Sequence, residues 1–409
     1  MRKVKVVEET AAETWSHRAD LAQSAVQERH ASRLWGLPKT NLAVVTWPPG
    51  SKDRLYWHWH YWWQAHYLDC QIDAAIRRPT KTHKRVLKDT LRGIQRRNLG
   101  KLTKNKYYDD KAWLALAWNR AVDEGLARRT KALDALEFDL LAGIDPVMGV
   151  LPWRTEETFY NVPSNGPAAL LFARTGRLDK ARELLDWTFD NLVTESGLVQ
   201  DGIRMRMHGP EVVDKLYTYN QGTVLGASLE IALALRADVG LRDDEPIDSF
   251  AYSKRADDSV FYITHIRAIV EAIVLHMATP QGVILNKPYE SGDGDGGLFK
   301  GILARYLADV AVRLPEDSRQ NIATKKIASR LIMASAESLW SHRLEVDGLP
   351  IFSARWTEDA RLPHNYGLGP SSLSEAVGLV RIDERDLSVQ LSGWMLLEAA
   401  ARVAAANSQ

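Results

Sequence analysis

Apolar residues recur along most of this chain at intervals of three and four positions, which places them on one face of an α-helix. Between residues 218 and 237, Leu225, Leu229 and Leu233 form such a stripe beside small Gly and Ala residues that permit close packing. The periodicity predicts about twelve helices. We place them at 8–34, 55–77, 82–98, 107–124, 126–141, 165–175, 178–194, 218–237, 257–279, 296–313, 318–342 and 388–407.

The segments between these helices carry turn-forming residues, whereas alternating β-branched residues are scarce. Breaks rich in Pro, Gly, Asn or Asp lie at 47–50, 145–146, 163–167, 242–246 and 279–282. Because no low-complexity linker divides the chain, we predict a single domain over residues 1–409. The pattern indicates an all-α protein and suits a toroid of helical hairpins, although other helical arrays fit it as well.

The composition of the chain argues against several classes of protein function. The 409 residues include 53 basic and 52 acidic side chains, and the resulting net charge of +1 gives no argument for binding nucleic acid or an anionic membrane. Cys70 is the sole cysteine, which excludes an intramolecular disulfide and a cysteine-ligated zinc site. No window approaches the roughly 18 consecutive apolar residues of a membrane span. Residues 1–9 lack the apolar stretch of a signal peptide, so we expect a cytoplasmic protein.

The stretch 107–118 joins two adjacent carboxylates, Asp109 and Asp110, to four aromatic side chains at the predicted start of a helix. Paired carboxylates serve as nucleophile and general acid in glycosidic bond cleavage. An Asp at a helix start is also a common N-cap. One Asp suffices for a cap, and a second charge buried beside it is costly, so the residue types leave both roles open. The other pairs, at 243–244 and 257–258, lie in charged surroundings typical of solvated or capping residues.

Two further stretches suggest metal ligation only superficially. His58, His60 and His66 lie in the aromatic stretch 56–67, but they lack the spacing of a His-Glu-x-x-His site. The loop 290–301 fails the calcium-loop template because glycine and alanine stand where ligands are required. We therefore expect no metal and no cofactor.

Polar clusters at 161–165 and 218–222 each open a predicted helix. Their Asn, Gln, Ser, Thr and Tyr side chains suit helix capping and hydrogen bonding to sugar hydroxyls equally well. The sequence leaves these two roles open.

Taken together, these stretches resemble glycoside hydrolase family 76, the endo-α-1,6-mannanases with an (α/α)6 barrel. The motifs occur in the family's order over most of the chain: 108–110 with Trp113, then 149–153, 161–165, 218–222, 299–301 and, more weakly, 352–356. The resemblance implies a retaining mechanism in which Asp109 is the nucleophile and Asp110 the general acid/base. It also implies an α-mannan or manno-oligosaccharide as substrate.

We expect sugar contacts from aromatic and polar residues near the predicted helix starts and loops. The candidates are Trp62, Tyr108, Trp113, Asn161, Asn165, Asp201, Tyr219, Asn220, Gln221, Asp293, Phe299 and Lys300. Without a visible leader, a bacterial α-1,6-mannan such as a lipomannan core is a more natural target than fungal-wall mannan. Two alternatives remain: another sugar enzyme on a similar barrel, such as an unsaturated-uronyl hydrolase or an epimerase, and a non-catalytic carbohydrate-binding member. A magnesium-dependent isoprenoid enzyme is disfavoured, because the residues after Asp110 do not supply the last Asp of an Asp-Asp-x-x-Asp motif.

Overall fold

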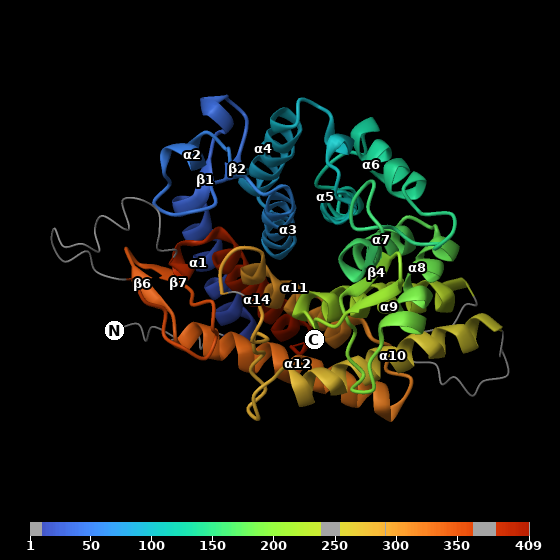
Figure 1. Ribbon diagram of the computed structural model, residues 1–409. Helices are drawn as coiled ribbons and strands as arrows, with labels where there is room; N and C mark the ends of the chain where they lie inside the picture. The colour runs from blue at the N-terminus through green and yellow to red at the C-terminus, as the bar shows by residue number, and fades with distance from the viewer. Residues whose placement is uncertain (1–9, 239–253, 291, 363–381, 409) are drawn as a thin grey trace.

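The computed structural model describes residues 10–238, 254–290, 292–362 and 382–408. Its helices form a toroid of helical hairpins, an (α/α)6 barrel (Figure 1). The inner wall consists of α3 (Tyr61–Arg77), α5 (Tyr108–Asp123), α7 (Val162–Arg174), α9 (Thr218–Asp238), α11 (Asp295–Arg313) and α14 (Leu387–Ala406). Each inner helix packs against the next one in this order, and α14 packs against α3, so the ring is closed.

An outer layer surrounds this wall. It consists of α4 (Lys81–Arg97), α6 (Lys131–Ala142), α8 (Leu178–Leu192), α10 (Lys254–His276), α12 (Arg319–Ser341) and α1 (Ala11–His30). Each outer helix packs on the inner helix that precedes it, except α1, which packs on α14 and so joins the two ends of the chain. Because hairpin partners run in opposite directions, the inner helices all start at the same mouth of the barrel.

Within the described residues, a helix lies at each of the predicted positions, with shifted ends. The segment 55–60 is not helical: the short helix α2 (Ser51–Arg54) precedes it, and α3 begins only at Tyr61. The expected break at 163–167 is wrong, because α7 begins at Val162. Asn161 caps α7 by accepting the N–H of Ser164, and Pro163 falls in the first turn, where its missing N–H loses no helical hydrogen bond.

Short strands were not expected and lie between the helices. The strands β3 (Phe159–Asn161), β4 (Gly202–Arg206) and β5 (Gly209–Val213) form an antiparallel sheet in that order. Two small hairpins pair β1 (Ala31–Ser32) with β2 (Leu42–Ala43), and β6 (Leu344–Val346) with β7 (Leu349–Ile351). Strands of two to five residues are too short to show a period-two pattern in the sequence.

The helix α10 has an apolar composition that bears on the membrane question. Its segment Asp258–His276 is the one helical stretch in the described residues that is long and apolar enough to cross a membrane. It packs against α9 and α12 as part of the outer layer, with 44% of it buried. The sequence-based expectation counted unbroken apolar runs and therefore did not register this helix.

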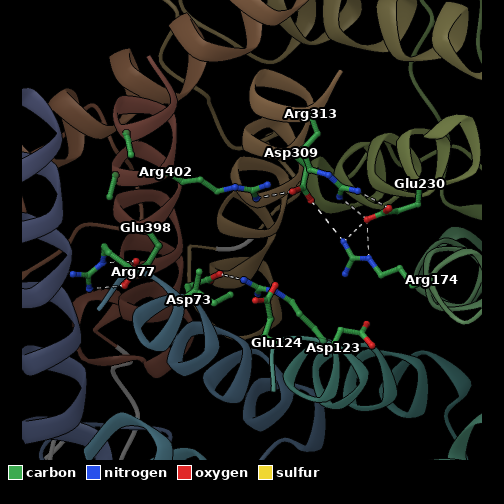
Figure 2. Close-up of a pocket in the computed structure, with 14 residues that line it drawn as sticks. Asp73, Arg77, Asp123, Glu124, Arg174, Glu230, Asp309, Arg313, Glu398 and Arg402 are labelled. Carbon is green, nitrogen blue, oxygen red and sulfur yellow. Dashed lines mark hydrogen bonds and ion pairs between the residues drawn. The ribbon is translucent and has the colours of Figure 1, made fainter. Parts of the chain in front are cut away.

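The last turns of the inner helices meet at the far mouth of the barrel, around a cavity of about 670 Å³ (Figure 2). Its wall is charged, and most of its charged side chains form ion pairs. Arg402 lies 2.6 Å from Asp309, and Arg313 lies 2.6 Å from Glu230. Arginine side chains are favoured at the C-terminal ends of helices, where the last backbone carbonyls carry partial negative charge. The carboxylates balance the positive charges of these arginines. This ion-pair network ties the inner helices together at the mouth away from Asp109.

Candidate active site

The first turns of the inner helices and the β3–β5 sheet surround a second cavity of about 320 Å³, here called the aromatic pocket. It is lined by Trp62, Asp109, Trp113, Trp153, Phe159, Asn161, Pro163, Asp201, Arg204, Val213, Tyr217, Tyr219, Asp295 and Phe299. The rings of Tyr219 and Phe299 stack with their centroids 4.1 Å apart. Aromatic faces and carboxylates together suit a ligand that combines apolar C–H faces with hydroxyl groups, as a sugar does.

Asp109 lies in the first turn of α5 and lines the aromatic pocket. Its Oδ1 accepts the backbone N–H of Asp110 at 2.8 Å, and its Oδ2 accepts the indole N–H of Trp153 at 3.0 Å. Burial raises the pKa of Asp109 to about 6, and the two hydrogen bonds partly oppose this rise. Neither aspartate is the N-cap, which is Tyr107, so capping does not account for the pair.

Asp110 is the next residue, but it is not among those that line the aromatic pocket. Its Oδ2 accepts a hydrogen bond of 2.6 Å from the side-chain amide of Asn105. Burial and the neighbouring charge of Asp109 raise the pKa of Asp110 well above its ordinary value. Two N–H groups stabilise the charge of Asp109 and a single amide group that of Asp110, so the hydrogen bonds favour the ionised form more strongly at Asp109 than at Asp110.

Several predicted sugar contacts meet at the aromatic pocket. Trp62, Trp113, Asn161, Asp201, Tyr219 and Phe299 all line it. Burial raises the pKa of the Asp201 carboxyl to about 6. Asn220 donates to Asp201 at 3.0 Å from a fully buried position, so Asn220 orients this carboxyl and does not itself line the pocket.

Asn165 and Gln221 have another role in the structure. The side-chain amide of Asn165 accepts the N–H of Leu151 and donates to its carbonyl, both at 2.9 Å. Gln221 holds Val199 in the same way, with both distances 2.8 Å. Each is buried and lies outside the pocket lining, and its amide is already engaged by the backbone.

The same arrangement recurs around the barrel. Gln64 binds the N–H and carbonyl of Ala43, and Gln390 binds those of Phe352. We call Gln64, Asn165, Gln221 and Gln390 the amide clamps. Each lies in the first turns of an inner helix and fixes the connection that precedes this helix, so the clamps hold the segments around the pocket.

Three other candidates lie away from the pocket lining. The ammonium nitrogen of Lys111 lies over the Tyr108 ring, 3.8 Å from the ring centroid. Lys300 donates to the carbonyl of Ala354 at 2.9 Å and lies 4.2 Å from the centroid of the Trp356 ring. Asp293 precedes α11 and is not a lining residue.

The structure also identifies pocket residues that sequence reasoning missed. Asp295, two positions after Asp293, lines the pocket and accepts the indole N–H groups of Trp62 and Trp63 at 3.0 and 2.8 Å. Trp153 stood in the 149–153 motif without being assigned a role. No pattern in the sequence marked Phe159, Arg204 or Tyr217 as pocket residues. A short sheet brings Phe159 and Arg204 to the pocket, and the connection before α9 brings Tyr217.

Across residues 10–238, 254–290, 292–362 and 382–408, no group of three or more His, Cys, Asp or Glu side chains is placed to hold a metal ion.

A helical barrel whose inner helices start around an aromatic, carboxylate-bearing pocket has the architecture of a glycoside hydrolase. Residues 20–239, more than half of the chain, match the model of Glycosyl hydrolase family 76. The chain therefore belongs to this family.

Solved structures agree with the family assignment. The GH76A α-1,6-mannanase of Salegentibacter sp. HEL1_6 is 25% identical, with a TM-score of 0.73 over 95% of this chain and 99% of that one. The Lin0763 protein of Listeria innocua is 24% identical, with a TM-score of 0.72 over 95% and 97% of the two chains. An unsaturated glucuronyl hydrolase specific for heparin shares the fold at 10% identity, with a TM-score of 0.61 over 98% of each chain. No curated protein sequence matches the chain significantly.

Proposed function

We propose that the protein hydrolyses internal α-1,6-mannosidic bonds of an α-mannan. The observation that carries this proposal is the Asp109–Asp110 pair beside a pocket walled by aromatic rings. The Salegentibacter mannanase supports it: that protein was solved with α-1,6-mannotriose and α-1,6-mannotetrose bound. Its inactive variants carry replacements at two adjacent aspartates. A bacterial mannan of the lipomannan-core type remains our proposed natural substrate.

The proposed mechanism retains the anomeric configuration. Asp109, ionised and exposed to the pocket, attacks the anomeric carbon and forms a mannosyl-enzyme ester. Asp110 gives its proton to the leaving glycosidic oxygen, so that the C–O bond breaks without release of an alkoxide. Asp110 then takes a proton from water, whose oxygen attacks the anomeric carbon and frees Asp109.

The raised pKa values support these roles. A general acid must hold its proton near the working pH, and Asp110 is the member of the pair held more strongly in the neutral form. Asp110 does not line the pocket, so its carboxyl rotates toward the leaving oxygen in the proposed mechanism.

The proposal is tested with linear α-1,6-mannan beside α-1,2- and α-1,3-linked mannans. We expect oligosaccharides from the first polymer alone, and NMR of the first-formed product should show the α-anomer before mutarotation. Release of mannose alone would contradict the endo mode. A β-anomer would contradict the role of Asp109 as nucleophile and point to a distant base, such as Asp201. Absence of hydrolysis of all three polymers would contradict the proposed activity.

A further inference from the structure

The basic side chains of this protein are distributed unevenly. Residues 81–106 contain ten Lys or Arg residues and a single acidic residue, Asp89, although the whole chain carries a net charge of +1. The apolar face of α4, with Leu87, Leu91 and Ile94, is buried and packs toward α3, so its basic residues project outward. Eight of the ten are exposed: Lys81, Lys84, Arg85, Lys88, Arg96, Lys101, Lys104 and Lys106. We call these eight residues the basic strip.

The basic strip is not neutralised by neighbouring carboxylates. In the part of the chain that the structure describes, none of its eight side chains takes part in an ion pair, whereas Arg92 on the same helix pairs with Asp89. The segment 31–60, which lies against α4 through β2, adds four basic residues and one acidic residue. The mean charge of the whole chain conceals this local excess.

Four large apolar side chains are exposed beside the end of the strip, and we call them the apolar tip. Their exposed fractions are 49% for Trp35, 50% for Leu55, 66% for Trp57 and 79% for Leu99. They come from three segments that lie side by side near α2, β1, β2 and α4 in Figure 1. Trp35 donates its indole N–H to the Leu55 carbonyl at 2.9 Å, which fixes one segment on another.

Arg97, at the end of α4, contacts both of the other segments that carry residues of the apolar tip. Its guanidinium donates to the carbonyl of Tyr56 at 3.0 Å and lies 6.0 Å from the centroid of the Trp35 ring. Leu99 follows two residues later. The backbone holds Trp35 and Leu99 at φ values of 49° and 51°, a left-handed region that residues with a Cβ avoid. Strained backbone therefore presents these two apolar side chains to solvent, and such strain is a mark of functional surfaces.

We propose that the apolar tip and the basic strip dock this enzyme onto an anionic lipid bilayer. Trp and Leu side chains enter the interfacial layer of a membrane, where indole rings are favoured. Lys and Arg side chains beside them are attracted to anionic head groups. A polyanion such as nucleic acid would engage the strip and leave Leu55 and Leu99 in water. A neutral mannan would stack on the tryptophans and leave the cations without a partner.

The position of the surface gives docking a consequence for the active site. The tip segment 51–60 directly precedes the inner helix that carries Trp62, and residues 98–106 directly precede the helix that carries Asp109. Docking therefore brings the starting mouth of the barrel, with its aromatic pocket, alongside the bilayer. This inference is independent of the bond that the enzyme cuts.

The experiment is flotation of the purified full chain with vesicles. One set contains phosphatidylcholine alone, and the other contains equal parts of phosphatidylcholine and phosphatidylglycerol, at near-physiological salt. We expect binding to the anionic vesicles and little binding to the neutral ones. Trp57→Ser with Leu99→Ser should weaken binding by roughly tenfold or more. Lys84→Ser with Lys88→Ser should do the same, since each cation near the surface contributes about fivefold.

Matched controls come from another outer face. Phe261→Ser with Leu275→Ser removes two exposed apolar side chains of α10, and Arg319→Ser with Lys326→Ser removes two exposed cations of α12. Both control variants should bind like the wild type. Circular dichroism confirms that each variant is folded. Failure of the wild type to float with anionic vesicles overturns the proposal. Unchanged binding of the Trp57 and Leu99 variant also overturns it, because the surface would then be a site for polyanions.

Discussion

Trp153 and Asp109, 44 positions apart in the sequence, are joined by a 3.0 Å hydrogen bond from the indole Nε1 to the carboxylate Oδ2. The bond fixes the connection before β3 on the first turn of α5. Since an N–H donor stabilises the charged form of a carboxylate, the bond opposes the rise in pKa that burial causes. Trp153 thereby sets the pH at which the proposed nucleophile becomes ionised.

Trp153→Phe should move the acidic limb of the pH profile of kcat/KM to higher pH. Removing the donor raises the pKa of Asp109 from about 6, so the reactive anion is lost at a higher pH. A hydrogen bond to a charged group is worth about 1.5–3 kcal/mol, which corresponds to a movement of about one pH unit or more. Trp118→Phe is the matched control, because the buried Trp118 indole N–H has no hydrogen-bond partner among the described residues. An unmoved acidic limb in Trp153→Phe would contradict this role.

Asn105→Ala should act on the opposite limb. The Asn105 amide lowers the pKa of Asp110, and its removal leaves this pKa still higher. Because the proposed acid is inactive once deprotonated, the basic limb of the profile should move to higher pH while the acidic limb stays in place. Movement of the acidic limb instead would indicate that Asp110 is the nucleophile and Asp109 the general acid/base.

Asp109→Asn and Asp110→Asn should each reduce turnover by several orders of magnitude without unfolding the barrel. The first variant lacks the nucleophile, and the second lacks the proton donor, for which general acid–base catalysis alone contributes roughly a hundredfold to ten-thousandfold. Activated mannosides with good leaving groups should partly restore the first step in Asp110→Asn and not in Asp109→Asn. Asp134→Asn, at a surface position of α6, is the control. Near wild-type turnover in either active-site variant would remove that residue from the mechanism.

The amide clamps should matter for stability more than for catalysis. Gln221→Glu keeps the acceptor for the Val199 N–H but loses the donors to the carbonyls of Val199 and Tyr217. We expect a loss of about 1–3 kcal/mol in the free energy of unfolding, measured with urea. Tyr219→Ala, which removes a ring from the pocket wall, should instead raise KM with a smaller effect on stability. A large rise in KM for Gln221→Glu at unchanged stability would favour a direct sugar contact.

The ion pairs at the far mouth predict an acid-sensitive contribution to stability. Burial alone would raise the pKa of Asp309, but Arg402, Arg313 and Arg174 more than offset it and lower the pKa from 3.8 to about 2. The stabilisation is therefore fully present above pH 4 and is lost as the pH falls through 2. Asp309→Asn should lower the free energy of unfolding by about 2 kcal/mol at neutral pH, because the buried Asp309 carboxylate is stabilised by the arginines around it.

The control for this experiment is Glu124→Gln, which removes an exposed carboxylate from the same cavity wall. Urea unfolding at several pH values measures both variants. A stability difference between wild type and Asp309→Asn that does not shrink from pH 4 toward pH 2 would contradict the assignment.

The helices of this barrel are predictable from the sequence because each buries a continuous apolar face whose spacing is visible in a short window. The Asp109–Asp110 pair was visible for the same local reason, as adjacent residues in an aromatic stretch. The pocket is different. Phe159 and Arg204 reach it on neighbouring strands that pair only in the folded chain. No local pattern indicates such a pairing.

Asp293 and Asp295 show that two acidic residues only two positions apart can differ in whether they line the pocket. Both are acidic residues of one glycine-rich loop, and sequence reasoning selected Asp293. Gly294 adopts a φ of 60°, after which α11 begins and directs Asp295 toward the indoles of Trp62 and Trp63. Residue type does not reveal that the amides of Asn165 and Gln221 bind the backbone, and a sugar contact from either residue stays a prediction.

The amide clamps have a consequence for the diversification of such barrels. Gln64, Asn165, Gln221 and Gln390 anchor four connections at a point close to the inner wall. Outside each anchor, a connection can grow, shrink or exchange its side chains without transmitting the change to the helix beneath. Recognition elements can thus be replaced one at a time, as interchangeable modules, while the reactive carboxylates keep their positions.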